Sequence, residues 1–256
     1  MTPDSLSAHL LGCGDAYDTE NHNSGLLVSQ DNYRLLIDCG PWLTRRVLDS
    51  VSDPDWLDAI YITHAHPDHA LGLTTLTNWM DSKKRKKTLT IYLQREQKSV
   101  VEALIRYAHW PSANLGYSVD YHYIEATREI GPWQAEFAPT RHAISNMSIK
   151  LTNNANHALF FSGDGELGEE GAELAASSDW VFVECQTYDW HHSHGSLLQI
   201  RALDKKPNSD WLLYHIDPVD REQIRCALSQ ENQMQVAEEG VVMDRTFAPE
   251  TGGIIC

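Results

Sequence analysis

Residues 61–73, YITHAHPDHALGL, place three histidines and an aspartate within six positions of one another. The residues on both sides of this cluster are largely apolar, so the cluster lies where a buried strand is expected to end. Proteins that mix strands and helices commonly place their chemistry at such strand ends. The order of the residues therefore predicts a functional loop between a strand and a helix.

The spacing of the polar residues in this loop favours metal binding. If the chain stays extended past the strand, His64 and His66 project to the same side and can hold one cation. Asp68 and His69 follow at the start of the next helix and face a second, adjacent position. Imidazole combined with carboxylate suits zinc, and also manganese, iron or nickel. The segment therefore predicts ligands for two neighbouring divalent metal ions, with zinc as the first choice.

One short loop cannot complete two coordination shells, so further ligands are expected elsewhere. Three later apolar strands end in a suitable residue: His142 in APTRHAISN, Asp164 in FFSGDGELG and His215 in LLYHIDP. Taken singly, His142 could be a surface histidine and Asp164 a turn residue. Taken together they form a consistent set. The predicted ligands are His64, His66 and His142 for one metal, and Asp68, His69 and His215 for the second, with Asp164 bridging the two.

Length and composition limit what the loop can belong to. With 256 residues and 42% hydrophobic content, the chain is expected to form one domain over residues 1–256. Its net charge of −16 repels polyanions and argues against extended nucleic acid as a partner. Neither a cationic leader nor an apolar run long enough to span a bilayer is evident, so we expect a cytoplasmic protein without membrane contact.

A basic run, KKRKK at residues 83–87, stands out against the acidic composition. It is predicted to be a solvated helix end or turn, and contact with a phosphate is the alternative.

Short strands predominate in both halves of the chain, and a few helices separate them. Strands are predicted at residues 6–13, 24–29, 33–40, 57–64, 87–93, 119–125, 133–140, 147–152, 157–164, 179–185 and 210–217. Helical spacing is found at residues 42–50, 69–80, 95–109, 168–177, 196–203 and 219–229. Each half runs through paired strands, then an apolar strand that ends in polar residues, then a helix. This repetition predicts an α/β protein with two sheets packed face to face and helices outside, a four-layer αββα sandwich.

The motif THAHPDH, with the later histidine, the SGD aspartate and the final YH histidine, resembles the His-x-His-x-Asp-His signature of metallo-β-lactamase-fold hydrolases. The resemblance covers nearly the whole chain. Within that superfamily the chain is most similar to the ribonuclease Z type of phosphodiesterase. The similarity lies in LLGCGDAYDTENHNSGLLV (10–28), LLIDCG (35–40) and ECQTYDWHHSHGS (184–196).

The resemblance also implies roles for individual residues. His194 would contact the scissile phosphate and protonate the leaving oxygen, oriented by Glu184, and Asp68 would orient a hydroxide that bridges the metals. Trp190, near His194, would either stack on a base or ribose or pack within the protein. We further hypothesise that Asp38 and Thr63 lie behind the metal-bearing histidines and hold their tautomers.

One departure from ribonuclease Z enzymes bears on the substrate. Those that process tRNA usually carry a long arm, which the bacterial form inserts after the position of His142, and the stretch from His142 to Asp164 leaves no room for it. Charge points in the same direction. Two divalent cations balanced by two aspartates and a hydroxide leave about one net positive charge, which suits a phosphodiester monoanion. We therefore favour a phosphodiesterase that acts on a small or cyclic phosphodiester.

Three other functions are consistent with the sequence. A lactone or thioester hydrolase would use the same hydroxide on a carbonyl and would have no need of His194. A tRNA 3′-end endoribonuclease and a non-catalytic, metal-containing accessory protein are the other two. Because the family often dimerises, a homodimer is also expected.

Overall fold

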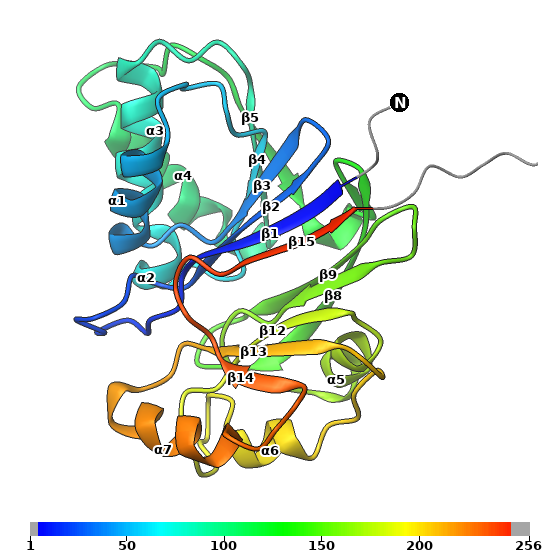
Figure 1. Cartoon of the computed structure of the whole chain (residues 1–256). Helices are drawn as coiled ribbons and strands as arrows, with labels where there is room; N and C mark the ends of the chain where they lie inside the picture. The colour runs from blue at the N-terminus through cyan, green and yellow to red at the C-terminus, as the bar shows by residue number, and fades with distance from the viewer. Residues whose placement is uncertain (1–4, 247–256) are drawn as a thin grey trace, which may run out of the picture.

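Two mixed β-sheets form the centre of the computed structural model, which describes residues 5–246 (Figure 1). In spatial order the first sheet contains β15 (Val242–Thr246), β1 (Ser5–Gly12), β2 (Gly25–Gln30), β3 (Tyr33–Ile37), β4 (Ala59–Tyr61), β5 (Leu89–Leu93) and β6 (Val119–Tyr123). The second contains β11 (Glu166–Leu167), β8 (Trp133–Arg141), β9 (Met147–Thr152), β10 (Ala158–Phe161), β12 (Trp180–Glu184), β13 (Asp210–Tyr214) and β14 (Met234–Val236), with β7 (Glu129–Ile130) paired to β8.

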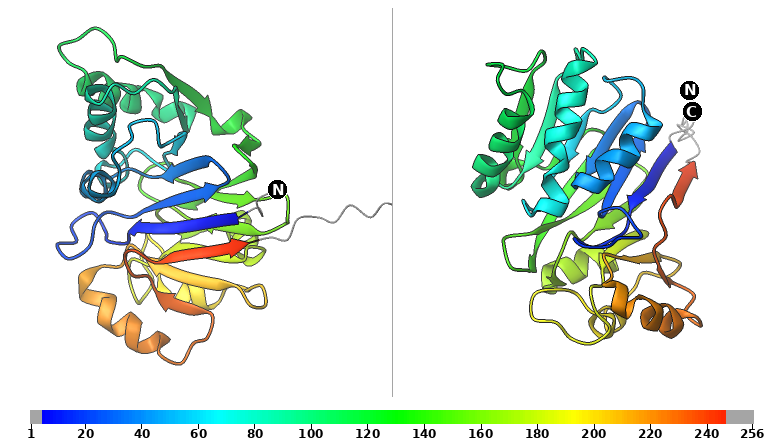
Figure 2. Two further views of the ribbon diagram at one scale, coloured as in Figure 1. Left: turned by 45° about the horizontal axis from the view of Figure 1, so that its top comes forward. Right: turned by 90° about the vertical axis from the view of Figure 1, so that its left-hand side faces the viewer.

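Helices cover the outer face of each sheet (Figures 1 and 2). Those of the first half are α1 (Pro41–Ser50), α2 (Pro67–Ala70), α3 (Gly72–Ser82) and α4 (Lys98–Ala108), and those of the second are α5 (Glu169–Ala176), α6 (Leu197–Arg201) and α7 (Pro218–Leu228). One hydrophobic cluster fills the space between the two sheets. A second lies between the first sheet and its helices, and a third lies between the second sheet and its helices. The predicted four-layer αββα sandwich is confirmed. Between residues 5 and 246 no helix combines the length and the apolar character needed to cross a bilayer.

The two halves repeat one topology, as the sequence indicated. In the first sheet β1, β2 and β3 pair antiparallel, and β3, β4, β5 and β6 then pair in parallel. The second sheet repeats this order, with antiparallel β8, β9 and β10 followed by parallel β10, β12, β13 and β14. The carboxyl ends of parallel strands meet at one edge of a sheet, so each half brings its polar strand ends together. A single domain over residues 1–256, a cytoplasmic location and a homodimer stay predictions.

The observed elements differ from the predicted ones in two respects. The helix expected at residues 69–80 is divided into α2 and α3 at Leu71, because the backbone N–H of Gly72 donates to Cys39 O at 2.9 Å. A Cβ at Gly72 would lie 2.2 Å from Gly40 O, so only glycine allows this approach. The short strands β7, β11, β14 and β15 were not predicted, since they are brief or only weakly apolar and form by pairing with strands already in place.

The interpretation of the basic run as solvated is wrong for Arg85. This side chain is 1% exposed, whereas the lysines on either side of it are exposed. Its guanidinium donates to the backbone carbonyls of Pro54 at 2.6 Å, Leu57 at 2.7 Å and Thr88 at 3.0 Å. Five N–H donors in a fixed fork allow arginine to satisfy several carbonyls at once. Arg85 therefore joins the end of α3 to the loop before β4.

Arg85→Ala should destabilise the fold by roughly 2–4 kcal/mol, because it leaves buried carbonyls without a charged donor. For a chain of this size that corresponds to a fall of about 5–12 °C in the midpoint of thermal unfolding. Lys83→Ala, a change of an exposed neighbour, is the matched control and should shift the midpoint by less than about 2 °C. Equal midpoints for the two variants would contradict the structural role of Arg85.

Candidate metal centre

The predicted site residues follow the ends of strands in both halves of the molecule. His64 and His66 come after β4, and His66 precedes α2, whose first residue is Pro67. Proline is well suited to that position because its φ is already helical and it needs no hydrogen-bond acceptor. His142 follows β8, Asp164 follows β10 and His215 follows β13. The packing of the two sheets thus brings four separate strand ends to one place.

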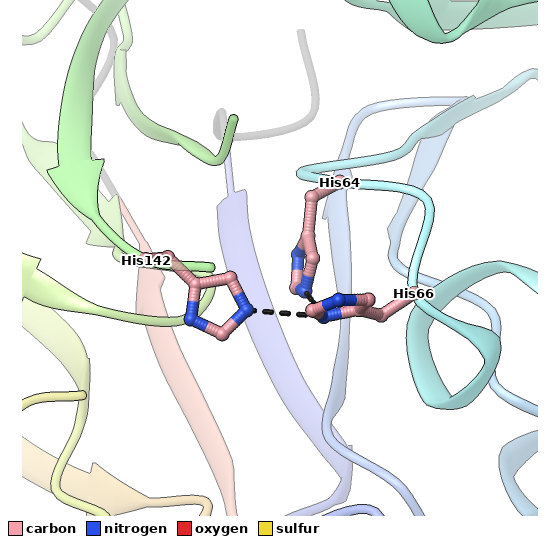
Figure 3. A group of neighbouring side chains, drawn as sticks. All are labelled: His64, His66 and His142. Atoms are coloured by element: carbon pink, nitrogen blue, oxygen red, sulfur yellow. Dashed lines mark hydrogen bonds between the residues drawn. The ribbon is translucent and has the colours of Figure 1, made fainter. Parts of the chain in front are cut away.

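Three imidazole nitrogens converge in the first cluster (Figure 3). His66 Nδ1 lies 3.0 Å from His64 Nε2 and 3.0 Å from His142 Nε2. A tetrahedral ion bound at about 2.0–2.1 Å holds its ligand atoms roughly 3.3 Å apart, so this spacing fits one ion. The structure therefore brings His64, His66 and His142 together, as the sequence predicted.

Hydrogen bonds on the outer side of the rings fix which nitrogen faces the centre. His142 Nδ1 donates to Ser193 O at 2.9 Å, and His69 Nδ1 donates to Asp38 Oδ2 at 2.8 Å. His215 Nδ1 donates to Gln186 Oε1 at 2.9 Å. In a neutral imidazole a proton on Nδ1 leaves a lone pair on Nε2, which is the form that binds a metal.

Asp164 lies between the first cluster and a second one made of Asp68, His69 and His215. Its Oδ1 is 3.2 Å from His69 Nε2 and its Oδ2 is 3.4 Å from His215 Nε2. The same carboxylate approaches the first cluster, with Oδ2 3.8 Å from His64 Nε2. Asp68 Oδ2 faces His69 Nε2 at 3.2 Å and His215 Nε2 at 3.4 Å. The position predicted for a bridging ligand is thus available to Asp164, and the ligand roles themselves stay a prediction.

Charges differ between the two clusters. Burial, and then the neighbouring His69, hold the pKa of His64 well below its ordinary value, so its ring is neutral. Burial would also lower the pKa of His215, but Asp164 and Asp68 outweigh it and raise that pKa to about 9. Burial opposes ionisation of Asp164 as well, yet the imidazoles around it hold its pKa well below the usual range. The second cluster therefore has two carboxylates that stabilise positive charge at its centre.

The donor atoms fit divalent cations in one further respect. His69 Nε2 and Asp164 Oδ1 are buried and make no hydrogen bond, although they lie 3.2 Å apart. Buried polar atoms without partners are costly, and a metal ion would satisfy both. Zinc, manganese, iron and nickel all accept imidazole and carboxylate groups as ligands. The two clusters could therefore hold metal.

Glu184 and His194 lie beside the clusters, as the resemblance implied. The carboxylate of Glu184, the last residue of β12, is fully buried and hydrogen-bonds to His194 Nδ1. Its other oxygen accepts from the backbone N–H of Gly165 at 2.6 Å and of Gly195 at 2.8 Å. Burial would lower the pKa of His194, but the hydrogen bond and charge of Glu184 outweigh it and raise that pKa. The Glu184 carboxylate thus holds the His194 ring beside the two clusters and favours its protonated form.

The hypothesis about Asp38 and Thr63 is supported by their contacts. Asp38 accepts from the Thr63 backbone N–H at 2.9 Å and from its hydroxyl, and Thr63 Oγ1 lies 3.1 Å from His64 Nδ1. One buried carboxylate therefore reaches histidines of both clusters, His69 directly and His64 through the Thr63 hydroxyl. Asp38 has a φ of 62°, a conformation that aspartate and asparagine tolerate better than most residues.

Two further residues that position the site were not predicted. Gln186 orients His215, and it lies two residues after Glu184, a spacing that places both on one side of an extended chain. The spacing from Glu184 could therefore have indicated Gln186 as a site residue from the sequence. Asn146 accepts from the Asp164 backbone N–H at 3.2 Å and donates to Ser162 O at 2.9 Å. At Gly163, which has a φ of 64°, a Cβ would lie 2.2 Å from Asn146 Oδ1, and nothing in the local sequence indicates this contact.

Comparisons with known proteins agree with this geometry. The family described as "Anti-Pycsar protein Apyc1" matches residues 6–243. An Anti-Pycsar protein Apyc1 of Paenibacillus harenae is 26% identical over 229 residues, which are 86% of this chain and 94% of that protein. A ribonuclease Z of Methanococcus aeolicus is 26% identical over 176 residues, 66% of this chain and 54% of that protein.

Among solved structures, the metallo-β-lactamase fold protein YhfI of Bacillus subtilis superposes with a TM-score of 0.80 at 20% identity. The superposition covers 94% of this chain and 100% of that one. The fold and the ribonuclease Z-like resemblance inferred from the sequence are confirmed.

Replacing Asp38 tests the support behind the metal ligands. Asp38→Asn keeps the size and tolerates the backbone conformation but removes the charge that holds His69, so metal affinity should fall roughly 10- to 100-fold. Competition with a chelator, with bound metal measured by elemental analysis, gives the affinity. Asp49→Asn, a change of an exposed aspartate on α1, is the control and should leave affinity unchanged. Equal affinity in Asp38→Asn and the wild type would sink the hypothesis.

Proposed function

Because the chain belongs to the Anti-Pycsar protein Apyc1 family, we propose that it is a metal-dependent phosphodiesterase that hydrolyses a small or cyclic phosphodiester. The observation that carries this proposal is the Glu184 and His194 pair beside the two clusters of metal-binding residues. Hydrolysis of a carbonyl ester by the same centre would not need His194 as a proton donor. Cleavage of a phosphodiester with an alkoxide leaving group is accelerated by such a donor, because the leaving oxygen is protonated as it departs.

The chain's own residues divide the work as follows. His64, His66 and His142 would hold one divalent cation, Asp68, His69 and His215 would hold a second, and Asp164 would be a ligand shared by both. Such cations would supply Lewis acidity to a phosphoryl oxygen and a lowered pKa to water. Asp68, which lines the cavity beside the second cluster, would orient the attacking water or hydroxide. We take zinc as the metal, because imidazole and carboxylate ligands suit it well.

His194 acts as the general acid. Its Nδ1 is held by Glu184, so Nε2 is the atom that delivers a proton to the leaving oxygen. The carboxylate favours the protonated imidazole, because its hydrogen bond and charge raise the pKa of His194. The ring of His194 lies 4.9 Å from that of His142, measured between centroids, so the proton is held next to the first cluster.

The size and charge of the cavity favour a small substrate. The metal cavity has a volume of about 360 Å³ and is lined by His66, Asp68, His142, Asp164, His194 and His215, among others. Cavities of roughly 300–1,000 Å³ are typical for small molecules. Between His142 and Asp164 the chain consists of β9, β10 and short turns, with no arm for tRNA. The net charge of −16 also argues against a polyanionic nucleic acid.

Turnover should depend on about two metal ions per chain. Chelator treatment should abolish hydrolysis of bis-p-nitrophenyl phosphate and of cyclic mononucleotides, and added zinc or manganese should restore it. A lactone and a thioester panel in the same assay tests the carbonyl alternative. Full metal content with ester turnover alone would replace the proposal by a lactonase or thioesterase function, and no turnover at full metal content would leave an accessory role.

His194→Ala should lower kcat for a cyclic mononucleotide by roughly 100- to 10,000-fold, because an alkoxide leaves poorly without a proton. The loss should be much smaller for bis-p-nitrophenyl phosphate, whose leaving group is stable as an anion. Metal content, measured in the same samples, should not change. His192→Ala, a change of an exposed neighbour, is the control and should retain full activity. Equal losses on both substrates would rule out a general acid at this position.

A further inference from the structure

His191 lies in the wall of the metal cavity, and we infer that its Nε2–H donates a hydrogen bond to a non-bridging oxygen of the phosphodiester. It precedes His194 in the same loop, and the rings of the two histidines are 5.1 Å apart between centroids. The inference rests on the proposed function and adds a second contact between this loop and the phosphate. The two histidines differ in their tasks, because His194 gives up a proton whereas His191 keeps its own.

The loop that carries both histidines is ordered and lies against the first cluster. At its base, Thr187 and Ser196 form a β-bridge that closes the loop. Farther along, the backbone carbonyl of Ser193 accepts from His142 Nδ1 at 2.9 Å, so a predicted metal ligand and the loop hold each other in place. His191 is therefore attached to a fixed segment, which reduces the entropic cost of a contact with substrate.

One hydrogen bond determines which nitrogen of His191 carries the proton. The Ser193 backbone N–H donates to His191 Nδ1 at 3.3 Å. Nδ1 is therefore an unprotonated acceptor, and the proton of the imidazole lies on Nε2. Burial, and then the neighbouring His194 and His192, lower the pKa of His191, which favours the same neutral form. No residue between 5 and 246 accepts a hydrogen bond from Nε2, so this N–H is available to a substrate.

A phosphodiester in this cavity needs hydrogen-bond donors for the oxygen that does not face the cations. In the described part of the chain the cavity wall contains neither lysine nor arginine. Four of its side chains are instead the carboxylates of Asp15, Asp68, Asp164 and Asp217. Carboxylates accept hydrogen bonds and repel a phosphate. The outer oxygen therefore depends on a neutral donor.

Two other neutral donors in the wall already have partners within the protein. The Thr187 hydroxyl donates to Asp189 O at 2.6 Å, and Gln186 Nε2 donates to Asp15 Oδ2 at 3.3 Å. The Nε2–H of His191 has no such partner. A neutral donor also suits this position, because a second imidazolium so close to His194 would disfavour the protonated form that the general acid needs.

Two amide substitutions test the position of the donor. Asparagine keeps an acceptor near the place of Nδ1, where the Ser193 N–H needs one, but carries no donor as far out as Nε2. Glutamine is longer and carries an N–H donor about as far out as Nε2. His191→Asn should therefore lower kcat/KM for a cyclic mononucleotide roughly 10- to 100-fold, as expected for a lost hydrogen bond to a charged group, and His191→Gln should recover most of that loss.

The leaving group distinguishes His191 from the general acid. Bis-p-nitrophenyl phosphate has the same non-bridging oxygens as a cyclic mononucleotide, but its leaving group is stable as an anion. His191→Asn should lower kcat/KM for both substrates by similar factors, whereas His194→Ala should affect mainly the cyclic mononucleotide. Metal content and the midpoint of thermal unfolding should match the wild type. His192→Ala, a change of an exposed neighbour, is the control and should retain full activity.

The outcomes separate this inference from the proposed function. If His191→Asn is as active as the wild type, or if His191→Gln is as impaired as His191→Asn, the contact is overturned while the phosphodiesterase function stands. A loss confined to the cyclic mononucleotide would overturn it as well, since His191 would then act on the leaving group. If the metal-loaded wild type hydrolyses neither substrate, the proposed function fails and the contact fails with it. Similar losses on both substrates, recovered in His191→Gln, support both.

Discussion

The buried carboxylate of Asp164 is the group on which the site depends most. It lies 3.2–3.9 Å from ring nitrogens of four histidines that come from both halves of the chain. An ionised carboxylate in such a place is stable only if positive charge surrounds it. The His215 imidazole, whose pKa is raised to about 9, supplies such charge, and divalent cations held by the two clusters would supply more. The two halves of the molecule are therefore held together electrostatically at the same point where the chemistry is proposed to occur.

The backbone conformation of two residues helps to fix the side chains around Asp164. Asp38 and His215 both have positive φ values, 62° and 54°, which are costly for residues other than glycine. Each is fixed by contacts beyond its own turn, since Asp38 binds Thr63 and His69, and the His215 backbone N–H donates to Cys13 O at 2.8 Å. Strained backbone is often found where a functional side chain must take one exact direction. The sandwich supplies the rigidity that keeps both residues in place.

The loop from β1 to β2 has a separate part in this organisation. At its base the backbone carbonyl of Cys13 accepts from the His215 backbone N–H, and Tyr17, further along the loop, is one of the residues that line the metal cavity. Asp18 binds Arg221 of α7, so this loop joins the first sheet to the helices of the second. The predicted metal ligands and the walls of the cavity are therefore positioned by the same contacts between the halves.

The sequence by itself determined the fold class and the set of residues that gather at the candidate site. Apolar strands that end in polar residues, repeated in both halves, were sufficient to predict the four layers, because strand periodicity and strand ends are local properties. The nine residues predicted for the site all gather there, since their types and order carry the signal. Only the tertiary structure decided the burial of Arg85, the roles of Gln186 and Asn146, and the place of His191 in the cavity wall. These depend on contacts between segments far apart in the chain, and no local pattern encodes which surfaces such segments will share.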